Sequence, residues 1–178
     1  VNLRLNATAL EVIKDGNNLQ GIIFSDREGL HKINADIIID CSGDGDIAAK
    51  AGVPYDKGNE NGEMMAGTLT FFMGNVDLDK FPENGDALNR ELIQRGIKEG
   101  KLSEDAYSLY MIPGYNSNTV FFNCPHIKGV DGTNPTEMTN ATNEARRRAV
   151  QLIRFIKKEV PGFSDAFVQQ MGPAMGIR

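Results

Sequence analysis

The sequence predicts a mixed α/β fold, of the α+β type within these 178 residues, from three observations. The first 34 positions hold short, partly alternating apolar runs bounded by Gly, Asn and Asp, which is typical of antiparallel strands. An unbroken Ile37-Ile38-Ile39 run follows, and such runs favour a strand buried on both faces of a parallel sheet. Two later segments repeat apolar residues every three or four positions, which predicts amphipathic helices.

The N-terminal elements follow in order. We expect strands over residues 3–12, 19–25 and 30–33, joined by polar turns, so that residues 1–34 form a small antiparallel meander. The Ile run then predicts a buried strand over residues 35–41. A short helix follows over residues 46–51, with Asp44 or Asp46 as its N-cap and Gly52 at its end.

The C-terminal two thirds alternate strands and helices. We expect strands over residues 68–73, 107–112 and 119–123, and a helix over residues 87–99. The longest helix starts at Asn134-Pro135, a cap followed by a proline suited to the first turn, and ends before Pro161-Gly162. Arg146-Arg147-Arg148 lies within it. Consecutive helical residues point in different directions, so this trio predicts a solvated face rather than an anion site.

Composition excludes several functions. The chain is 40% hydrophobic, enough for a packed core, and its net charge of −5 argues against partnership with nucleic acid or anionic membrane. No apolar run reaches the roughly 20 residues that cross a bilayer. Two distant cysteines favour a reducing compartment, and hence a cytoplasmic protein. The chain opens on Val rather than Met, which predicts the central part of a longer protein, so missing targeting signals carry no information.

A glycine loop follows the expected buried strand. Gly43, Gly45 and Ala48 satisfy the loose G-x-G-x-x-A dinucleotide pattern. However, no second strand follows the short helix, and Asp44 and Asp46 would repel a pyrophosphate. Ionised carboxylates instead accept hydrogen bonds from hydroxyl groups, such as those of a ribose or ribitol chain. The loop therefore fits the sugar-alcohol part of a nucleotide better than its phosphates.

Other interpretations of the same loop stay open or are weaker. A helix cap without any ligand explains the residues equally well. A calcium half-loop would need acids where Lys50 and Gly52 stand. Ser42 lacks the G-x-S-x-G context of a nucleophile. Elsewhere, Cys124-Pro125-His126 lacks further metal ligands in the sequence, and we expect no metal site.

Several segments together resemble one family. Ile37 to Tyr55 is similar to the "vIDATGDGDlAarAGapy" segment of the FAD-dependent oxidoreductases that are related to the flavin subunit of heterodisulfide reductases. Further matches are Val130-Asp131-Gly132-Thr133-Asn134-Pro135-Thr136, Val160-Pro161-Gly162-Phe163, and Gly176-Ile177-Arg178, which resembles the start of "GIREsRRi".

The resemblance implies an FAD cofactor and an FAD/NAD(P)-binding Rossmann-like domain. Residues 1–62 would belong to that domain, residues 63–170 to a mixed substrate-side α+β domain, and residues 171–178 to the return into the FAD-binding domain. Cys41 and Ser42 replace the usual Ala-Thr, and we expect Cys41 to be buried rather than redox-active. The cofactor-binding residues would be Ser42, Gly43, Asp44, Gly45, Asp46 and Arg178.

The implied activity is hydride or electron transfer between FAD and a small organic substrate, with an unidentified electron acceptor and possible assembly into a homo-oligomer. The alternative is a non-enzymatic α+β module for ligand binding or interaction. The sequence assigns no catalytic residue. Side chains available in the substrate-side part are Tyr107, Tyr110, Tyr115 and His126.

Overall fold

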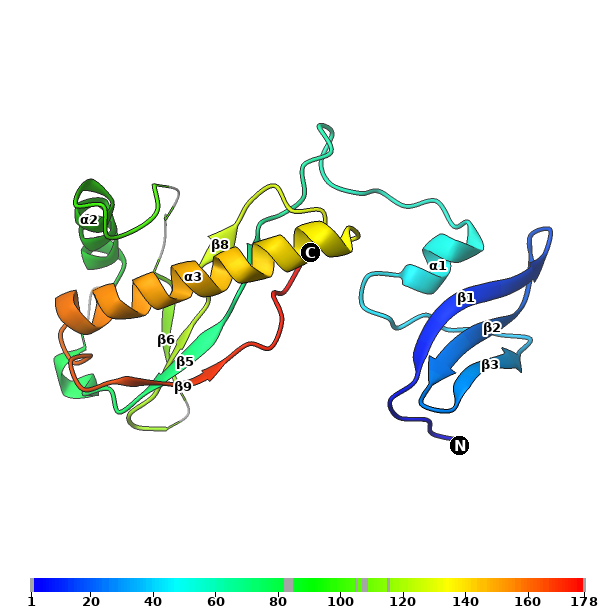
Figure 1. The fold of residues 1–178 in the computed structure, drawn as a ribbon, viewed down its shortest axis with the longest axis horizontal. Coiled ribbons are helices and arrows are strands. Elements are labelled where there is room, and N and C mark those ends of the chain that lie inside the picture. Colours follow the sequence, from blue (N-terminus) through cyan, green and yellow to red (C-terminus); the bar gives the residue numbers. More distant parts are fainter. Residues whose placement is uncertain (1, 82–84, 105, 107–108, 115, 178) are drawn as a thin grey trace. The chain divides into compact units, whose positions relative to one another are not determined.

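The computed structural model describes every residue except 1, 82–84, 105, 107, 108, 115 and 178. The chain divides into two compact units, Val1–Lys57 and Gly58–Arg178. Each contains helix and small antiparallel sheet (Figure 1). The predicted mixture of α and β structure is therefore confirmed.

The first unit is built on a three-stranded antiparallel sheet, drawn in blue in Figure 1. Its strands are β1 (Thr8–Asp15), β2 (Asn18–Asp26) and β3 (Gly29–Asn34), in the spatial order β1-β2-β3. The meander predicted over residues 1–34 is thus confirmed. The sheet buries little. Phe24 and Ile47 are the only buried hydrophobic side chains among the described residues of this unit.

Residues 35–41, predicted as a buried strand, form no strand within the described part of the chain. The segment is extended, but none of the described residues pairs with it as a strand, and Ile37 and Ile39 are each 82% exposed. A parallel strand needs neighbours on both sides to satisfy its backbone and bury its side chains, and the described part of the unit supplies none. The helix that follows, α1 (Asp46–Ala51), and its end at Gly52 are as predicted.

The second unit contains a four-stranded antiparallel sheet in the order β6-β7-β5-β9. Its strands are β5 (Phe71–Gly74), β6 (Met111–Pro113), β7 (Val120–Phe122) and β9 (Phe167–Met171). A separate pair joins β4 (Gly67–Thr68) to β8 (His126–Ile127).

These strands differ from the predicted ones in three ways. The strand expected over residues 68–73 is split, because β4 pairs with β8 whereas β5 pairs with β7 and β9. The strand expected over residues 107–112 begins at Met111, and positions 107 and 108 lie outside the described residues. Nothing in the sequence predicted β9, since four of its five side chains are exposed and show no inward alternation.

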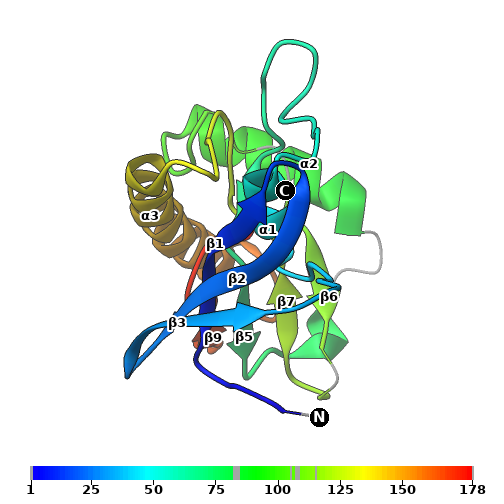
Figure 2. The same cartoon turned by 90° about the vertical axis from the view of Figure 1, so that its right-hand side faces the viewer.

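Two helices and one short 3-10 turn complete the second unit. The turn is η1 (Leu78–Lys80), and α2 (Gly85–Lys98) buries Leu92 and Ile93 as predicted, while the side chain of Leu88 lies outside the described residues. The long α3 (Pro135–Glu159) runs alongside the sheet (Figure 2). Its predicted cap is confirmed: the Asn134 side chain accepts hydrogen bonds from the backbone N–H groups of Thr136 and Glu137.

One face of α3 and one face of the sheet enclose the core of the second unit. The Phe71 and Phe122 rings stack 4.6 Å apart, and Phe163 meets Phe122 edge-on at 5.9 Å. Small residues on α3 let the helix approach closely, because alanine adds little bulk. The buried residues of α3 are Ala141, Ala145, Ala149, Leu152, Phe155 and Ile156.

The basic trio on α3 only partly follows its prediction. Arg147 is exposed and donates two hydrogen bonds to the Glu144 carboxylate. Arg148 is half-buried and also donates to Glu144, at 2.6 Å. Arg146 is half-buried, and its guanidinium donates to the Pro173 carbonyl at 2.9 Å. The prediction of a solvated face is therefore wrong for Arg146 and Arg148, because segments distant in sequence pack over them.

Candidate functional site

Asp40 organises the glycine loop of the first unit. Its carboxylate accepts hydrogen bonds from the backbone N–H of Ser42 at 2.9 Å and from that of Ala48 at 2.8 Å. The Ser42 hydroxyl in turn accepts from the backbone N–H of Asp46 at 2.9 Å. Hydrogen bonds from the Ser42 hydroxyl and from these backbone groups stabilise the ionised form and lower the pKa of Asp40. Two side chains thus tie the end of the extended segment to the start of α1.

This arrangement corrects the predicted helix cap. The N-cap position of α1 is Gly45, which has no side chain that could cap the helix. Neither Asp44 nor Asp46 caps the helix; both are exposed, and no described residue hydrogen-bonds or pairs with either carboxylate. The side chains of Asp40 and Ser42 cap the helix instead, by accepting hydrogen bonds from its first backbone N–H groups. The carboxylates of Asp44 and Asp46 are therefore left exposed to solvent.

The loop needs glycine at two positions. Gly43 has φ of 101° and Gly45 has φ of 74°, values that side chains rarely adopt. A Cβ added at either position would meet no atom within 4 Å. Backbone geometry, rather than crowding within the chain, therefore requires these glycines, and the space in front of the loop backbone is open.

The two cysteines behave differently, and both are free. Cys41, expected to be buried, is exposed, because the segment that carries it has no strand neighbours among the described residues. Cys124 is buried in the second unit, where burial raises the pKa of its thiol to about 12. A thiol that stays protonated is a poor nucleophile, so Cys124 is a core residue.

One cluster in the first unit has the composition of a metal site. Ligand atoms of Asp26, Glu28 and His31 lie within 4.8 Å of one another at the β2–β3 turn. Internal contacts account for the cluster. The Asp26 carboxylate accepts from the Glu28 backbone N–H, lies 2.8 Å from His31 Nε2, and pairs with Arg4. The Asp26 carboxylate thus stabilises the hairpin, and the nearby Arg4 cation disfavours a metal ion.

A groove of about 560 Å³ opens in the second unit. Polar side chains reach it from separate parts of the chain: Thr68 and Thr70 from β4 and the residues after it, Asn123 from the end of β7, and His126 from β8. The C-terminal segment beside them adds Gly172, Pro173, Ala174, Gly176 and Ile177 to the lining. Thr68 Oγ1 lies 2.7 Å from His126 Nδ1, a hydrogen bond that fixes the imidazole.

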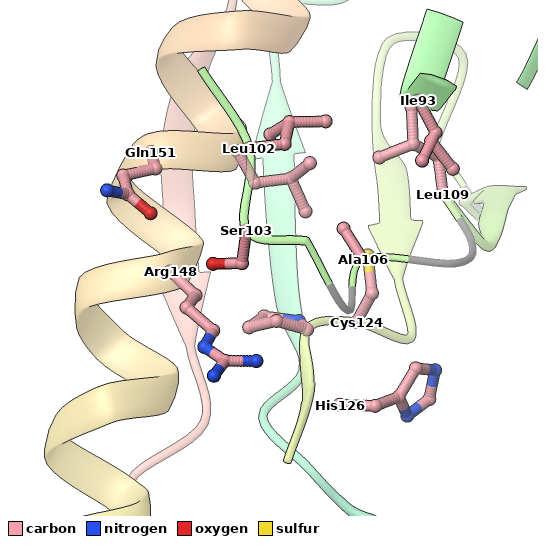
Figure 3. A pocket seen from close by; sticks show the side chains of 11 residues that line it. Ile93, Leu102, Ser103, Ala106, Leu109, Cys124, His126, Arg148 and Gln151 are labelled. Carbon is pink, nitrogen blue, oxygen red and sulfur yellow. The ribbon is translucent and has the colours of Figure 1, made fainter. Parts of the chain in front are cut away.

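A second, smaller cavity of about 40 Å³ adjoins His126 (Figure 3). Arg148 and Gln151 project toward it from α3, and Leu109 and Cys124 lie across from them. Its walls are mostly apolar, and its volume admits about one water molecule. It is too small for an organic substrate, so the groove is the better candidate for ligand binding.

Comparison with known proteins decides the family. The model of the FAD dependent oxidoreductase family matches residues 1–178, the whole chain. The chain belongs to this family. None of the curated proteins and none of the solved structures matches it. Family membership makes this protein an FAD-dependent oxidoreductase and favours an enzyme over a non-enzymatic binding module.

The structure of this oxidoreductase brings most of the predicted cofactor residues together. Residues 42–46 form one loop, whereas Arg178 lies outside the described residues. Among the side chains noted for the substrate-side part, His126 lines the groove and Tyr110 is 54% exposed. Tyr107 and Tyr115 lie outside the described residues. In the described part of the chain, no helix has the length and apolar character to cross a membrane.

Sequence reasoning missed the residues that organise both sites. Asp40 lies at the end of the predicted strand, although an Asp side chain often accepts a hydrogen bond from the backbone N–H two residues further along. Thr68, Thr70 and Asn123 carried no signal, since Asn123 lies more than 50 positions from the two threonines. Only tertiary structure places them beside His126.

Proposed function

We propose that this FAD-dependent oxidoreductase moves hydride or electrons between FAD and a small organic substrate, and that residues 42–46 bind the hydroxyl groups of the cofactor. One observation carries the proposal. Two glycines with positive φ leave the loop backbone open, next to two exposed carboxylates that no described residue engages. When bound, FAD supplies the redox chemistry, which protein side chains do not.

The chemistry of this loop fits the sugar-alcohol part of FAD. The Asp44 and Asp46 carboxylates are hydrogen-bond acceptors only, and ribityl or ribose hydroxyls are donors. The same two charges disfavour phosphate at this position. Gly43 and Gly45 permit a ligand to approach the backbone closely. Asp40 fixes the loop from behind through two backbone N–H groups and does not itself have to contact the cofactor.

The exposed Ile37 and Ile39 favour a further part of the proposal. We assign residues 35–41 as a strand of a Rossmann-like sheet whose neighbouring strands come from polypeptide outside residues 1–178. Such neighbours would cover two side chains that are each 82% exposed and would bury Cys41. Residues 1–62 then belong to the FAD-binding domain and residues 63–170 to the substrate side.

The end of the chain is proposed to return to the FAD-binding domain over residues 171–178. Gly176 is fixed by two backbone hydrogen bonds with Thr68, each 2.9 Å. This anchorage and the family resemblance of Gly176-Ile177-Arg178 support Arg178 as an anion or flavin contact.

An absorbance titration tests the function. The product of the complete reading frame is purified, and the flavin spectrum is followed as FAD is added to protein stripped of cofactor. We expect saturable binding with a shifted flavin spectrum. Residues 1–178 alone are expected to bind FAD weakly or not at all, because no phosphate-binding turn lies in them. A complete protein that neither contains nor takes up FAD would refute the proposal.

A further inference from the structure

The groove of the second unit has a lining without formal charge. Its side chains are Thr, Asn, His, Met, Ile, Ala and Pro, with glycine backbone between them. No Asp, Glu, Lys or Arg is among the described lining residues. A charged group that binds against this lining loses hydration and gains no counter-charge from the described lining side chains. The lining therefore selects for neutral ligands.

Three side chains supply the hydrogen-bonding capacity of the groove: Thr70, Asn123 and His126. Thr70 offers a hydroxyl and Asn123 an amide, and no described residue hydrogen-bonds either side chain. His126 adds an imidazole whose Nδ1 is engaged by Thr68. Burial lowers the pKa of His126, which favours the neutral form of the ring. Hydroxyl, amide and neutral imidazole are partners for hydroxyl and carbonyl groups.

The C-terminal segment that lines the groove is held in place by backbone contacts and one side chain. The Gly172 N–H donates to the Thr70 carbonyl at 2.8 Å, and Thr68 and Gly176 exchange two hydrogen bonds. Arg146 of α3 donates to the Pro173 carbonyl at 2.9 Å. These contacts join the C-terminal segment to β4, to the residues after it and to α3. The groove is thus formed without a ligand, which reduces the entropy cost of binding.

We propose that this groove is the substrate site, and that it takes a neutral organic molecule rich in hydroxyl or carbonyl groups, hydrogen-bonded by Thr70, Asn123 and His126. The assignment rests on the proposed function, because it makes the ligand the substrate of the flavin enzyme. Thr68 is a positioning residue, since it acts through the imidazole of His126.

Binding of three sugars of matched size tests the proposal. Glucose is neutral, glucuronate is anionic and glucosamine is cationic, and all three keep the pyranose ring. Each is titrated into the full chain and followed by NMR of the Asn123 side-chain amide and the His126 imidazole. We expect saturable shifts with glucose and at least tenfold weaker binding of both charged sugars. No saturable shift with glucose, or equal binding of a charged sugar, would overturn the proposal.

Substitutions of the groove side chains test whether glucose binds in the groove. Thr70→Val and Asn123→Leu are expected to weaken glucose binding at least fivefold each, while Thr136→Val, an exposed position on α3, leaves it unchanged. Circular dichroism and the unfolding midpoint check that each variant is folded. His126→Gln keeps a neutral hydrogen-bonding group and is expected to retain more binding than His126→Leu. If all four groove variants bound glucose with the affinity of the wild-type chain, the assignment would be contradicted.

The readout separates this proposal from the proposed function. The sugar titration is made without FAD, on side chains of the second unit. Loss of sugar binding with normal FAD uptake by the complete protein would remove only the substrate assignment. Failure of FAD uptake with normal sugar binding would remove the flavin function and leave a neutral-ligand groove.

Discussion

Two apolar segments with similar strand-like sequences have opposite environments. In the second unit, Leu69, Phe71 and Met73 are at most 1% exposed. In the first unit, Ile37 and Ile39 are 82% exposed. The difference lies in neighbours: β5 is flanked by β7 and β9, whereas no described residue forms a strand beside residues 35–41. An apolar run thus shows that a segment requires burial, but not which part of the polypeptide buries it.

The same contrast holds for the two units as wholes. The continuous hydrophobic core lies in the second unit, while the described part of the first buries only Phe24 and Ile47 among its hydrophobic residues. Buried apolar area is the main favourable term in folding. We therefore expect the second unit to unfold cooperatively. In the first unit, we expect the backbone amides to be protected from exchange with solvent mainly by the hydrogen bonds of the three-stranded sheet.

The largest expected effect separates the two segments directly. Phe122→Ala removes a ring that packs on Phe71 and Phe163, and it should lower the free energy of unfolding by about 3–5 kcal/mol. Ile39→Ala in the same 178-residue chain should change it by less than about 0.5 kcal/mol. Urea unfolding followed by circular dichroism measures both. If Ile39→Ala were as costly as Phe122→Ala, the isoleucine would be buried and the comparison would fail.

A smaller effect tests the backbone of the glycine loop. Gly45 is in the left-handed region with φ of 74° and ψ of 31°, so Gly45→Ala should destabilise the loop by about 1–2 kcal/mol. The Ala49 N–H, which donates to the Gly45 carbonyl, should exchange faster with solvent. Ala51→Gly, a change within the same helix at ordinary helical φ, is a control for helix propensity alone. Unchanged exchange at Ala49 in Gly45→Ala would show that the loop does not require glycine there.

The smallest effect concerns a carboxylate of the second unit. Hydrogen bonds from Arg147 and then Arg148 lower the pKa of Glu144 to about 2. A lowered folded-state pKa adds stability that is present above the unfolded pKa of about 4.3 and is lost as pH falls toward 2. Glu144→Gln should therefore cost roughly 1 kcal/mol at pH 7, after allowance for solvent screening. Urea unfolding at several pH values should show the two proteins converge near pH 2; a difference independent of pH would contradict this cause.

Local signals made much of the fold predictable. The meander, the short helix with its glycine end, and the Asn134 cap of α3 depend on residues close in sequence. The strand predicted over residues 35–41 does not form, because no described residue pairs with this segment. The exposed strand β9 was missed because it pairs through its backbone and buries little.

The candidate sites, like the fold, could be predicted only where they depend on residues close in sequence. The loop of residues 42–46 was predicted from its glycines and carboxylates, but its organiser Asp40 was not, because Asp40 reaches eight positions along the chain to Ala48. The groove combines residues that lie far apart in sequence, from Met65 to Ile177. Only His126 among its polar side chains had been singled out, and only as a residue available for catalysis.

The central claim is that the carboxylates of the glycine loop hold the hydroxyl groups of FAD. The most direct measurement is the FAD dissociation constant of the complete protein carrying Asp44→Ala or Asp46→Ala, compared with Asp36→Ala, an exposed acid outside the loop. Loss of a hydrogen bond to a charged group is worth about 1.5–3 kcal/mol. We predict FAD binding weakened at least tenfold by each loop variant and unchanged by Asp36→Ala. Equal affinity in all three variants and the wild type would contradict the account.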